Sequence, residues 1–209
     1  MLANLEYTLP FLGQGGVHPP FPQDHTVRSR PGGWAYPDML EVGNLANATE
    51  DRSHFGAWAI ISSPLILSFN MNDTARLDRV WPIITNKAVI AVNQRWVGDP
   101  GRRIAVSVDG LQVWAKAIDT QSYAVFLMNT ADEPLQSSLP LQNISSIFSI
   151  DRGVVCVLDL YTGKALPPLA VGVHLVASLT VHDSGMYCVW PLSDGQLCRA
   201  PSACLSLSS

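Results

Sequence analysis

The hydrophobic pattern of this chain changes its period between residues 99 and 102, which divides the sequence into two parts. Before this point, residues that could pack inward recur at helical spacing, as His54, Trp58 and Ser62 do. After it, from Arg103 onward, apolar and polar residues alternate. A spacing near 3.6 residues predicts helices, and a period of two predicts strands. We therefore expect an α/β part followed by an antiparallel β-sandwich.

Three helices and one or two short strands are expected in the first part. Glu50 and Asp51 suit a helix N-terminus, because negative charge is stabilised there, and Pro64 ends that helix. Thr85 is the expected cap of the last helix. The expected elements are a strand or loop at Gly33–Asp38, a helix after Thr49, a buried strand at Leu65–Phe69, a helix at Asp73–Val80 and a helix ending at Asn93.

Seven strands are expected in the second part. The pair Asp109-Gly110 predicts the turn of a first hairpin. The expected strands are Arg103–Val108, Leu111–Ala117, Ser122–Met128, Ile144–Ile150, Val154–Tyr161, His174–Val181 and Met186–Trp190. Dense Gly and Pro residues predict an irregular lead-in over residues 1–30, and the Ser-rich residues 193–209 predict a loose tail.

The composition is that of a globular protein and argues against several classes of partner. Hydrophobic residues make up 47% of the chain, charged residues make up 14%, and the net charge is −4. Binding to nucleic acid needs clustered Lys and Arg, and no such cluster occurs. The most apolar stretch, Phe55–Phe69, is interrupted by Pro64 and is too short to span a bilayer. Because there is no Gly-rich phosphate loop and no cluster of metal ligands, we expect no cofactor and no metal.

The four cysteines leave two alternatives open. They are Cys156, Cys188, Cys198 and Cys204. They could be buried or unpaired thiols, or they could form one or two disulfides in an oxidising compartment. The Asn-x-Ser/Thr tripeptides at Asn47, Asn72 and Asn143 are compatible with secretion, whereas no Lys or Arg precedes the first apolar residues as in a signal peptide.

A series of motifs in residues 31–100 resembles glycoside hydrolase family 27, the α-galactosidases and α-N-acetylgalactosaminidases. The string Gly32-Gly33-Trp34-Ala35-Tyr36-Pro37-Asp38-Met39-Leu40, followed by Glu41-Val42-Gly43-Asn44, is similar to the family motif G-W-N-D-P-D-M-L-x-V-G-N. The match continues in order through Arg52–Phe55, Trp58–Ile60, Ser63–Ile66 and Thr85–Gln94.

The resemblance implies a (β/α)8 TIM barrel followed by an antiparallel β-domain. It places Gly33–Met39 near the seventh barrel strand and Leu65–Phe69 at the eighth. Such a barrel takes about 250 residues, and only about 100 precede the β-rich part here. We therefore expect a C-terminal remnant of the barrel at residues 31–101 and a β-sandwich domain at residues 102–192, in a truncated chain.

The catalytic carboxylates of the family are not found in the sequence. Retaining glycosidases use two carboxylates about 5 Å apart, one as nucleophile and one as acid/base. The resemblance implies an Asp two residues after a Lys and an Asp four residues after an Arg. None of Lys87, Lys116 and Lys164 is followed by such an Asp, and Gly32 and Trp34 stand four residues after Arg28 and Arg30.

The resemblance implies a partial sugar site that contains Trp34, Tyr36, Asp38 and Met39. It makes Asp38 a polar organiser and Met39 an apolar contact to the sugar. The alternative is that Pro37-Asp38 forms a turn, that Met39 belongs to the core and that Trp34 is a core aromatic. Tyr36 departs from the family, because Ala35-Tyr36 replaces Asn-Asp, but it still offers a ring and a hydroxyl. Asn70 and Arg95 also replace Asp residues that are common in the family.

Two further His-containing positions are expected to be structural. His54 is expected to be packed and hydrogen-bonded in a helix. The trio His182-Asp183-Ser184 cannot form a catalytic relay, because adjacent residues of a strand point to alternate faces.

Two functions remain open at this stage. The first is an α-galactosidase-like glycoside hydrolase that acts on terminal α-galactosides of a glycan, with this chain as an inactive part of it. The second is a non-catalytic module that binds a glycan or a partner chain. The resemblance implies secretion or a lysosomal or vacuolar location.

Overall fold

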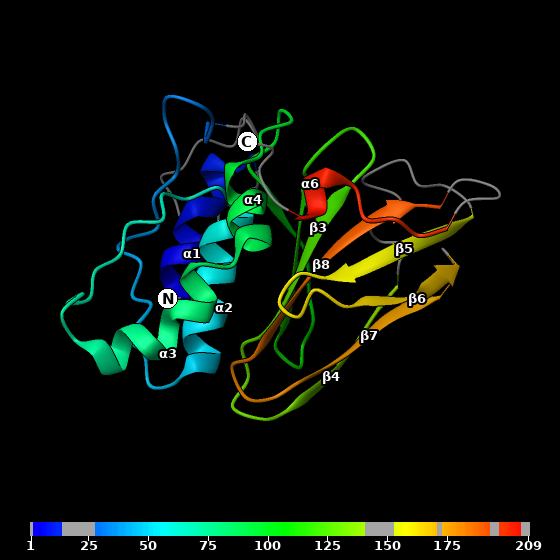
Figure 1. The fold of residues 1–209 in the computed structure, drawn as a ribbon. Coiled ribbons are helices and arrows are strands. Elements are labelled where there is room, and N and C mark those ends of the chain that lie inside the picture. The colour runs from blue at the N-terminus through cyan, green and yellow to red at the C-terminus, as the bar shows by residue number, and fades with distance from the viewer. Residues whose placement is uncertain (1, 14–27, 141–152, 171–172, 193–196, 206–209) are drawn as a thin grey trace.

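The structure is a computed structural model that describes residues 2–13, 28–140, 153–170, 173–192 and 197–205. A layer of helices covers one face of a six-stranded antiparallel sheet, and a two-stranded ribbon accompanies the sheet on the other side (Figure 1). Among the described residues, every helix is too short or too polar to cross a bilayer.

The six-stranded sheet has the order β1-β2-β3-β8-β5-β6, and the ribbon pairs β4 with β7. All of these pairings are antiparallel, as a sandwich requires. The strands are β1 (Arg102–Val106), β2 (Leu111–Ala117), β3 (Tyr123–Asn129), β4 (Leu135–Pro140), β5 (Val154–Asp159), β6 (Ala165–Ala170), β7 (His174–Leu179) and β8 (Ser184–Pro191).

Both faces of the sheet are buried, which explains why β3 is buried along its whole length. Alternate side chains of a strand point to opposite faces. Trp114, Phe126 and Met186 lie opposite one another across β2, β3 and β8 and pack with the helices. Val125 and Tyr187 belong to the other face, in the cluster that contains apolar side chains of β4 and β7. The predicted α/β part followed by an antiparallel β-sandwich is therefore confirmed.

The three helices predicted in the first part are present with shifted ends. They are α2 (Ala48–Ile60), α3 (Thr74–Ile84) and α4 (Lys87–Gln94). Each begins after a side chain that accepts a hydrogen bond from a free backbone N–H of the first turn, and these caps are Asn47, Asp73 and Asn86. The prediction of Thr85 as a cap is wrong, because the Thr85 hydroxyl instead donates to the Trp81 carbonyl at the end of α3.

The strand predicted at Leu65–Phe69 is wrong as a regular strand. Only Leu67 pairs, in a single parallel bridge with Leu40. A parallel strand needs a ladder of neighbours, and the described part of the chain offers this segment one contact of that kind. The bridge joins the two segments that the family resemblance places on adjacent barrel strands, which fits a C-terminal barrel remnant.

The irregular lead-in predicted for residues 1–30 is wrong for residues 2–11. They form α1 (Leu2–Thr8) and the 3-10 helix η1 (Leu9–Phe11). Leu5, Leu9 and Leu12 are each 2% exposed and belong to the same core as α2. Their spacing of four and three residues forms one helical face. This apolar stripe outweighs the Gly and Pro residues that follow it, and residues 14–27 lie outside the described part.

Close backbone approach fixes α2 against the sheet. A Cβ atom on Gly56 would lie 2.5 Å from the Tyr161 hydroxyl and 2.6 Å from the Phe126 ring. Gly101 has a φ of +98°, and a Cβ there would lie 1.9 Å from the Ile60 carbonyl oxygen. Glycine is required where two segments pack this closely.

A fully buried lysine joins the sheet to the helical layer. Lys116 on β2 donates from Nζ to Ser62 Oγ at 2.6 Å, to the Asn93 carbonyl at 3.1 Å and to the Val92 carbonyl. Burial lowers its pKa to about 7. The three oxygen acceptors satisfy the amine where the chain leaves α2 and α4, so β2 and the helices are linked by polar contacts as well as by packing.

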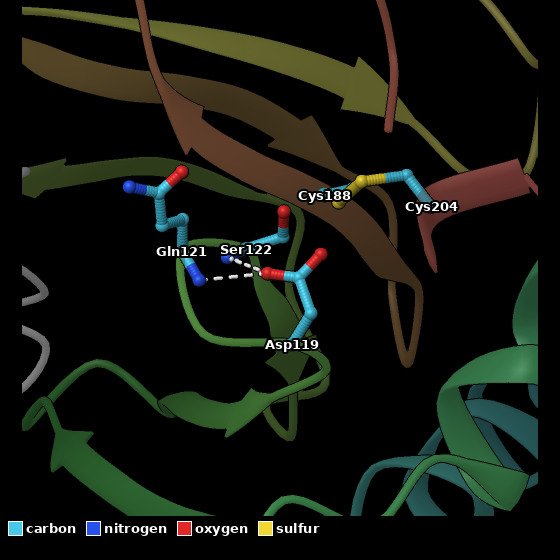
Figure 2. The surroundings of a disulfide bond; sticks show 5 residues. All are labelled: Asp119, Gln121, Ser122, Cys188 and Cys204. Carbon is cyan, nitrogen blue, oxygen red and sulfur yellow. Dashed lines mark hydrogen bonds between the residues drawn. A yellow bond between two sulfur atoms is a disulfide. The ribbon is translucent and has the colours of Figure 1, made fainter. Parts of the chain in front are cut away.

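The loose tail predicted for residues 193–209 is wrong for residues 197–205. Disulfides join Cys156 with Cys198 and Cys188 with Cys204, and none of the four cysteines is free. Figure 2 shows the second disulfide connecting β8 with α6 (Ser202–Leu205). The disulfide alternative is thus the correct one of the two left open by the sequence.

Most of the remaining strand predictions are confirmed. The hairpin of β1 and β2 and strands β3, β5, β7 and β8 are confirmed with ends that differ by a few residues. The turn between β2 and β3 is stabilised by Asp119, whose carboxylate accepts from the backbone of Gln121 and Ser122 (Figure 2). Strands β4 and β6 were not predicted, and the strand predicted at Ile144–Ile150 lies outside the described residues.

We predict that replacing Cys188 and Cys204 together with Ala lowers the free energy of unfolding by about 3 kcal/mol, since the bond closes a loop with a sequence separation of 16. Urea unfolding measures the change. Ser202→Ala, an exposed position on the same short helix, is the matched control and should leave the midpoint unchanged. Free thiols detected in the native, unreduced protein would contradict the pairing.

Candidate functional site

A cavity of about 610 Å³ opens between α1 and the residues that carry the family-like motif. One wall is helical, and the other is the irregular segment 33–38. The lining residues are Asn4, Tyr7, Thr8, Phe11, Arg28, Ser29, Gly33, Trp34, Ala35, Tyr36, Pro37 and Asp38. Cavities of about 300–1,000 Å³ are typical of small-molecule sites, so this cavity is the candidate site.

Asp38 is held in a strained backbone conformation at the rim of this cavity. Its φ is +129°, a region that an L-residue other than Gly rarely adopts. The Trp58 indole N–H donates to the Asp38 carbonyl at 3.1 Å, and the Met39 N–H donates to Asp38 Oδ1 at 2.8 Å. Such strain persists only where the surroundings enforce it, and it is concentrated at functional positions.

Neighbouring residues fix the segment that precedes Asp38. Ser29 is buried, and its hydroxyl accepts from the Ala35 N–H at 2.9 Å. The Trp34 ring packs edge-on against Trp96, with centroids 5.4 Å apart. Contacts with Ser29 and with Trp96 therefore hold this segment in place, although it forms no regular strand.

The end of the motif is fixed by an ion pair between α2 and α3, in which Asp51 is buried and Arg79 is half-buried. Asp51 is fully buried, and its Oδ2 lies 3.0 Å from Arg79 Nη2. Asp51 Oδ1 accepts from the Gly43 N–H at 2.7 Å, and Arg79 donates to the Gly43 and Leu45 carbonyls. Because both charges are also hydrogen-bonded to the backbone here, they fix the path of the chain where it leaves the site.

Helix α1 supplies the opposite wall, and side-chain contacts hold it to the motif segment and to β1. Asn4 Nδ2 donates to Asp38 Oδ2 at 3.2 Å. Glu6 pairs with Arg103 on β1. After η1, the Phe11 carbonyl accepts from the N–H groups of Arg28 and Ser29, each at 2.9 Å. The cavity is therefore built from two segments that are separated by residues 14–27 in the chain.

Three of the four predicted site residues line this cavity together. Trp34 is half-buried, whereas Tyr36 and Asp38 are exposed to solvent. Met39 is 47% exposed and does not line the cavity, so the alternative that made it a core residue is wrong. Among the substituted family positions, Asn70 caps a turn by accepting from the Asn72 N–H.

The α1 residues of the site were missed by the sequence analysis. The signal that could have found them is the stripe of Leu2, Leu5, Leu9 and Leu12, which places Asn4, Tyr7 and Thr8 on adjoining helical positions.

The chemistry available in the cavity is binding by rings and polar groups. Asp38 is the single carboxylate among the described residues that line it. A retaining glycosidase needs a second carboxylate about 5 Å away. Within the described ranges, no group of three or more His, Cys, Asp or Glu side chains is placed to hold a metal ion.

Two of the described His residues outside the cavity, His54 and His182, make structural contacts. The His54 ring stacks on Trp58 at 3.9 Å, and its Nε2 accepts from the Glu41 N–H at 3.2 Å. His182 contacts the carboxylates of Glu50 and Asp132, each at 3.2 Å.

The neighbours of His182 have other partners. Asp183 pairs with Arg52, and Ser184 Oγ lies 3.1 Å from the Tyr161 hydroxyl. The trio His182-Asp183-Ser184 therefore does not form a relay, as predicted. The reason differs from the predicted alternation along a strand, because His182 lies in the turn before β8, which begins at Ser184.

Comparison with known proteins connects this chain to one group of enzymes. The family model described as "Alpha galactosidase A" matches residues 21–95. An α-galactosidase of Cyamopsis tetragonoloba is 43% identical over 169 residues, which are 78% of this chain and 38% of that protein. An α-galactosidase of Oryza sativa subsp. japonica is 34% identical over 162 residues, which are 77% of this chain and 37% of that protein.

Solved structures share the fold of this chain. The α-galactosidase I of Mortierella vinacea superposes with a TM-score of 0.68 at 30% identity. The superposed part is 78% of the present chain and 41% of the Mortierella chain. The MEL1 α-galactosidase of Saccharomyces cerevisiae gives a TM-score of 0.67 at 21% identity, over 77% of this chain and 48% of that one. This chain therefore spans less than half the length of these relatives.

We predict that His54 makes the protein less stable in acid. Burial lowers the pKa of His54 to about 4, so the unfolded chain binds more protons than the folded one between that value and 6.5. The stabilisation from neutral His54 is complete above pH 6.5 and is lost as the pH falls, by about 3 kcal/mol at pH 4.

Urea unfolding of wild type and His54→Gln at pH 7 and pH 4 measures this loss. Gln can still accept the Glu41 N–H but does not titrate, so its loss between the two values should be smaller. The pKa of His182 is raised, chiefly by its hydrogen bond to Glu50. Protonation of His182 therefore stabilises the folded state as the pH falls, in the wild type and in the variant alike. Equal losses in wild type and variant would refute the assignment to His54.

Proposed function

Because the chain belongs to the α-galactosidase family of glycoside hydrolases, family 27, we propose that it is the C-terminal part of a retaining enzyme for terminal α-galactosides. In this proposal it supplies the end of the barrel, part of the sugar site and the β-sandwich. The observation that supports it is the site itself: three motif residues, Trp34, Tyr36 and Asp38, line one cavity of suitable size.

Each motif residue has a proposed role in sugar binding. Asp38 accepts hydrogen bonds from sugar hydroxyls, and its strained backbone directs the carboxylate to the rim. Trp34 and Tyr36 offer ring faces to the apolar face of a sugar. Met39 is a further apolar contact in the complete site, and its 47% exposure leaves it accessible to the rest of a barrel.

Catalysis requires carboxylates that these 209 residues do not provide. Whatever lies upstream of residue 1, no lysine of the sequence has an Asp two residues later, and neither Arg28 nor Arg30 has an Asp four residues later. Asp99 follows Arg95 at that spacing, but it lies beyond the segment that the resemblance places at the eighth strand, and it accepts from Arg102. The described lining of the cavity holds one carboxylate where the reaction needs two. We therefore propose that the 209-residue chain by itself is catalytically inactive.

An oxidising compartment fits the covalent structure. Two disulfides connect the sheet with residues 197–205, and disulfides persist in secreted and vacuolar proteins rather than in the cytosol. We propose a secreted or vacuolar location on this ground.

The test is hydrolysis of 4-nitrophenyl α-D-galactopyranoside by the purified chain, with Asp38→Asn as the paired variant. Both should release no nitrophenol above the blank, because the second carboxylate is absent. A product of the same gene that carries the two missing Asp contexts upstream of these residues should hydrolyse the substrate. Turnover by the 209-residue chain that Asp38→Asn abolishes would refute the inactive state, and an inactive longer product would refute the galactosidase assignment.

A further inference from the structure

Two Asn-x-Thr tripeptides of the described chain take no part in lining the candidate cavity. They are Asn47-Ala48-Thr49 and Asn72-Asp73-Thr74. In secreted proteins, an Asn that is followed two residues later by Ser or Thr, with no Pro between them, is the acceptor for N-linked glycans. Such a glycan is bulky and polar, so the accepting side chain must be free to point into solvent. A third tripeptide, at Asn143, lies outside the described residues.

The side chain of Asn47 caps helix α2 and keeps its amide nitrogen free. Asn47 is exposed, and its Oδ1 accepts from the Glu50 N–H at 2.9 Å. Among the residues that the structure describes, none forms a hydrogen bond with Asn47 Nδ2. An N-linked glycan is attached through this nitrogen, and the side-chain carbonyl oxygen remains an acceptor. The helix cap and a glycan are therefore compatible at Asn47.

Asn72 lies in an exposed turn that precedes α3. Its backbone N–H donates to Asn70 Oδ1 at 3.0 Å, and the Asp73 N–H donates to the Asn70 carbonyl at 3.0 Å. Within the described ranges, the Asn72 side chain and the Thr74 hydroxyl make no hydrogen bond. Since backbone contacts hold the turn, the side chain of Asn72 is free to carry a large polar group on the surface.

The fold brings the two tripeptides to the same end of the helical layer. Helices α2 and α3 both begin there (Figure 1). Arg76, in the first turn of α3, donates to Asn44 Oδ1 at 2.7 Å and so connects the start of α3 with the loop that leads to Asn47. Glycans at both positions would flank Met71, which is 49% exposed next to Asn72.

The covalent structure gives an independent reason to expect this modification. The two disulfides fit an oxidising compartment. The lumen of the endoplasmic reticulum is such a compartment, and N-linked glycans are transferred to proteins there. A chain that acquires its disulfides in this lumen exposes its Asn-x-Thr tripeptides to the same enzymes.

We propose that Asn47 and Asn72 are N-glycosylation sites, which place two neighbouring glycans where α2 and α3 begin. In the transfer, Nδ2 attacks C1 of the reducing-end sugar of an oligosaccharide that is carried on a lipid diphosphate. The C–N bond forms, the bond from C1 to the diphosphate oxygen breaks, the lipid diphosphate leaves, and the nitrogen loses one proton. The inference rests on the secreted or vacuolar location proposed above and does not depend on hydrolysis of a substrate.

Secretion of the 209-residue chain from a eukaryotic host, behind a cleavable signal peptide, tests both sites. An Asn143→Asp background removes the third tripeptide, and electrophoretic mobility before and after peptide N-glycosidase treatment measures the number of glycans. We expect two steps in this background, one in Asn47→Asp or Asn72→Asp, and none when both are changed. Asp preserves the acceptor of the α2 cap. Asn70→Asp, the same change at an exposed Asn with no Ser or Thr two residues later, should keep both steps.

Substitutions of Thr49 separate the effect of the tripeptide from that of the Asn side chain. Thr49→Ala should remove the glycan at Asn47, whereas Thr49→Ser should keep it. A secreted chain without glycans would overturn the proposal, and a site whose Asn→Asp change removes no step would be refuted. Thiol quantification in the same unreduced product distinguishes the two proposals. Paired cysteines in an unglycosylated chain would leave the proposed location standing, whereas free thiols would remove its ground as well.

Discussion

Burial of both faces of the six-stranded sheet holds the helical layer and the two-stranded ribbon in place. Helix α2 lies close against one face because Gly56 allows the Phe126 ring and the Tyr161 hydroxyl to approach its backbone. The ribbon of β4 and β7 packs with the other face. Since the barrel remnant has no complete sheet of its own among the described residues, its helices are organised by packing against the β-domain. Lys116 and the backbone contact at Gly101 secure the same junction.

This arrangement explains how the candidate site keeps its shape in a partial barrel. The motif segment around Asp38 forms no regular strand, but Trp58 on α2 and Ser29 hold it in place. Helix α1 buries its leucines in the shared core and presents Asn4 and Tyr7 to the cavity. Among the described residues, the lining of this site combines rings with one carboxylate, whereas retaining hydrolysis requires two.

Much of the fold could be predicted from the sequence because Asp109-Gly110 marks the turn between β1 and β2, β3 is a continuous apolar run, and acidic residues mark the first turn of α2. Helix α2 and strand β3 are buried on nearly all sides, so neither shows a clear apolar period. Strand β6 was not predicted, because Pro167 and Pro168 argue against a strand; as an edge strand it tolerates them, since it lacks a neighbour on one side. Helix α1 was hidden by the Gly and Pro residues that follow it. Three of the predicted site residues do line one cavity, but its α1 wall depends on tertiary packing that local patterns do not encode.

We infer that α1, helices α2 to α4 and the β-domain at residues 102–192 fold as one cooperative unit around a shared core. Native-state hydrogen exchange of the unreduced 209-residue chain measures this cooperativity. Amides of α1 should be protected, and the most protected amides of α2 and of β3 should exchange with the same opening free energy. Exchange of the α1 amides at the rate of an unfolded peptide, or separate opening of α2 and β3, would show that the parts do not fold as one unit.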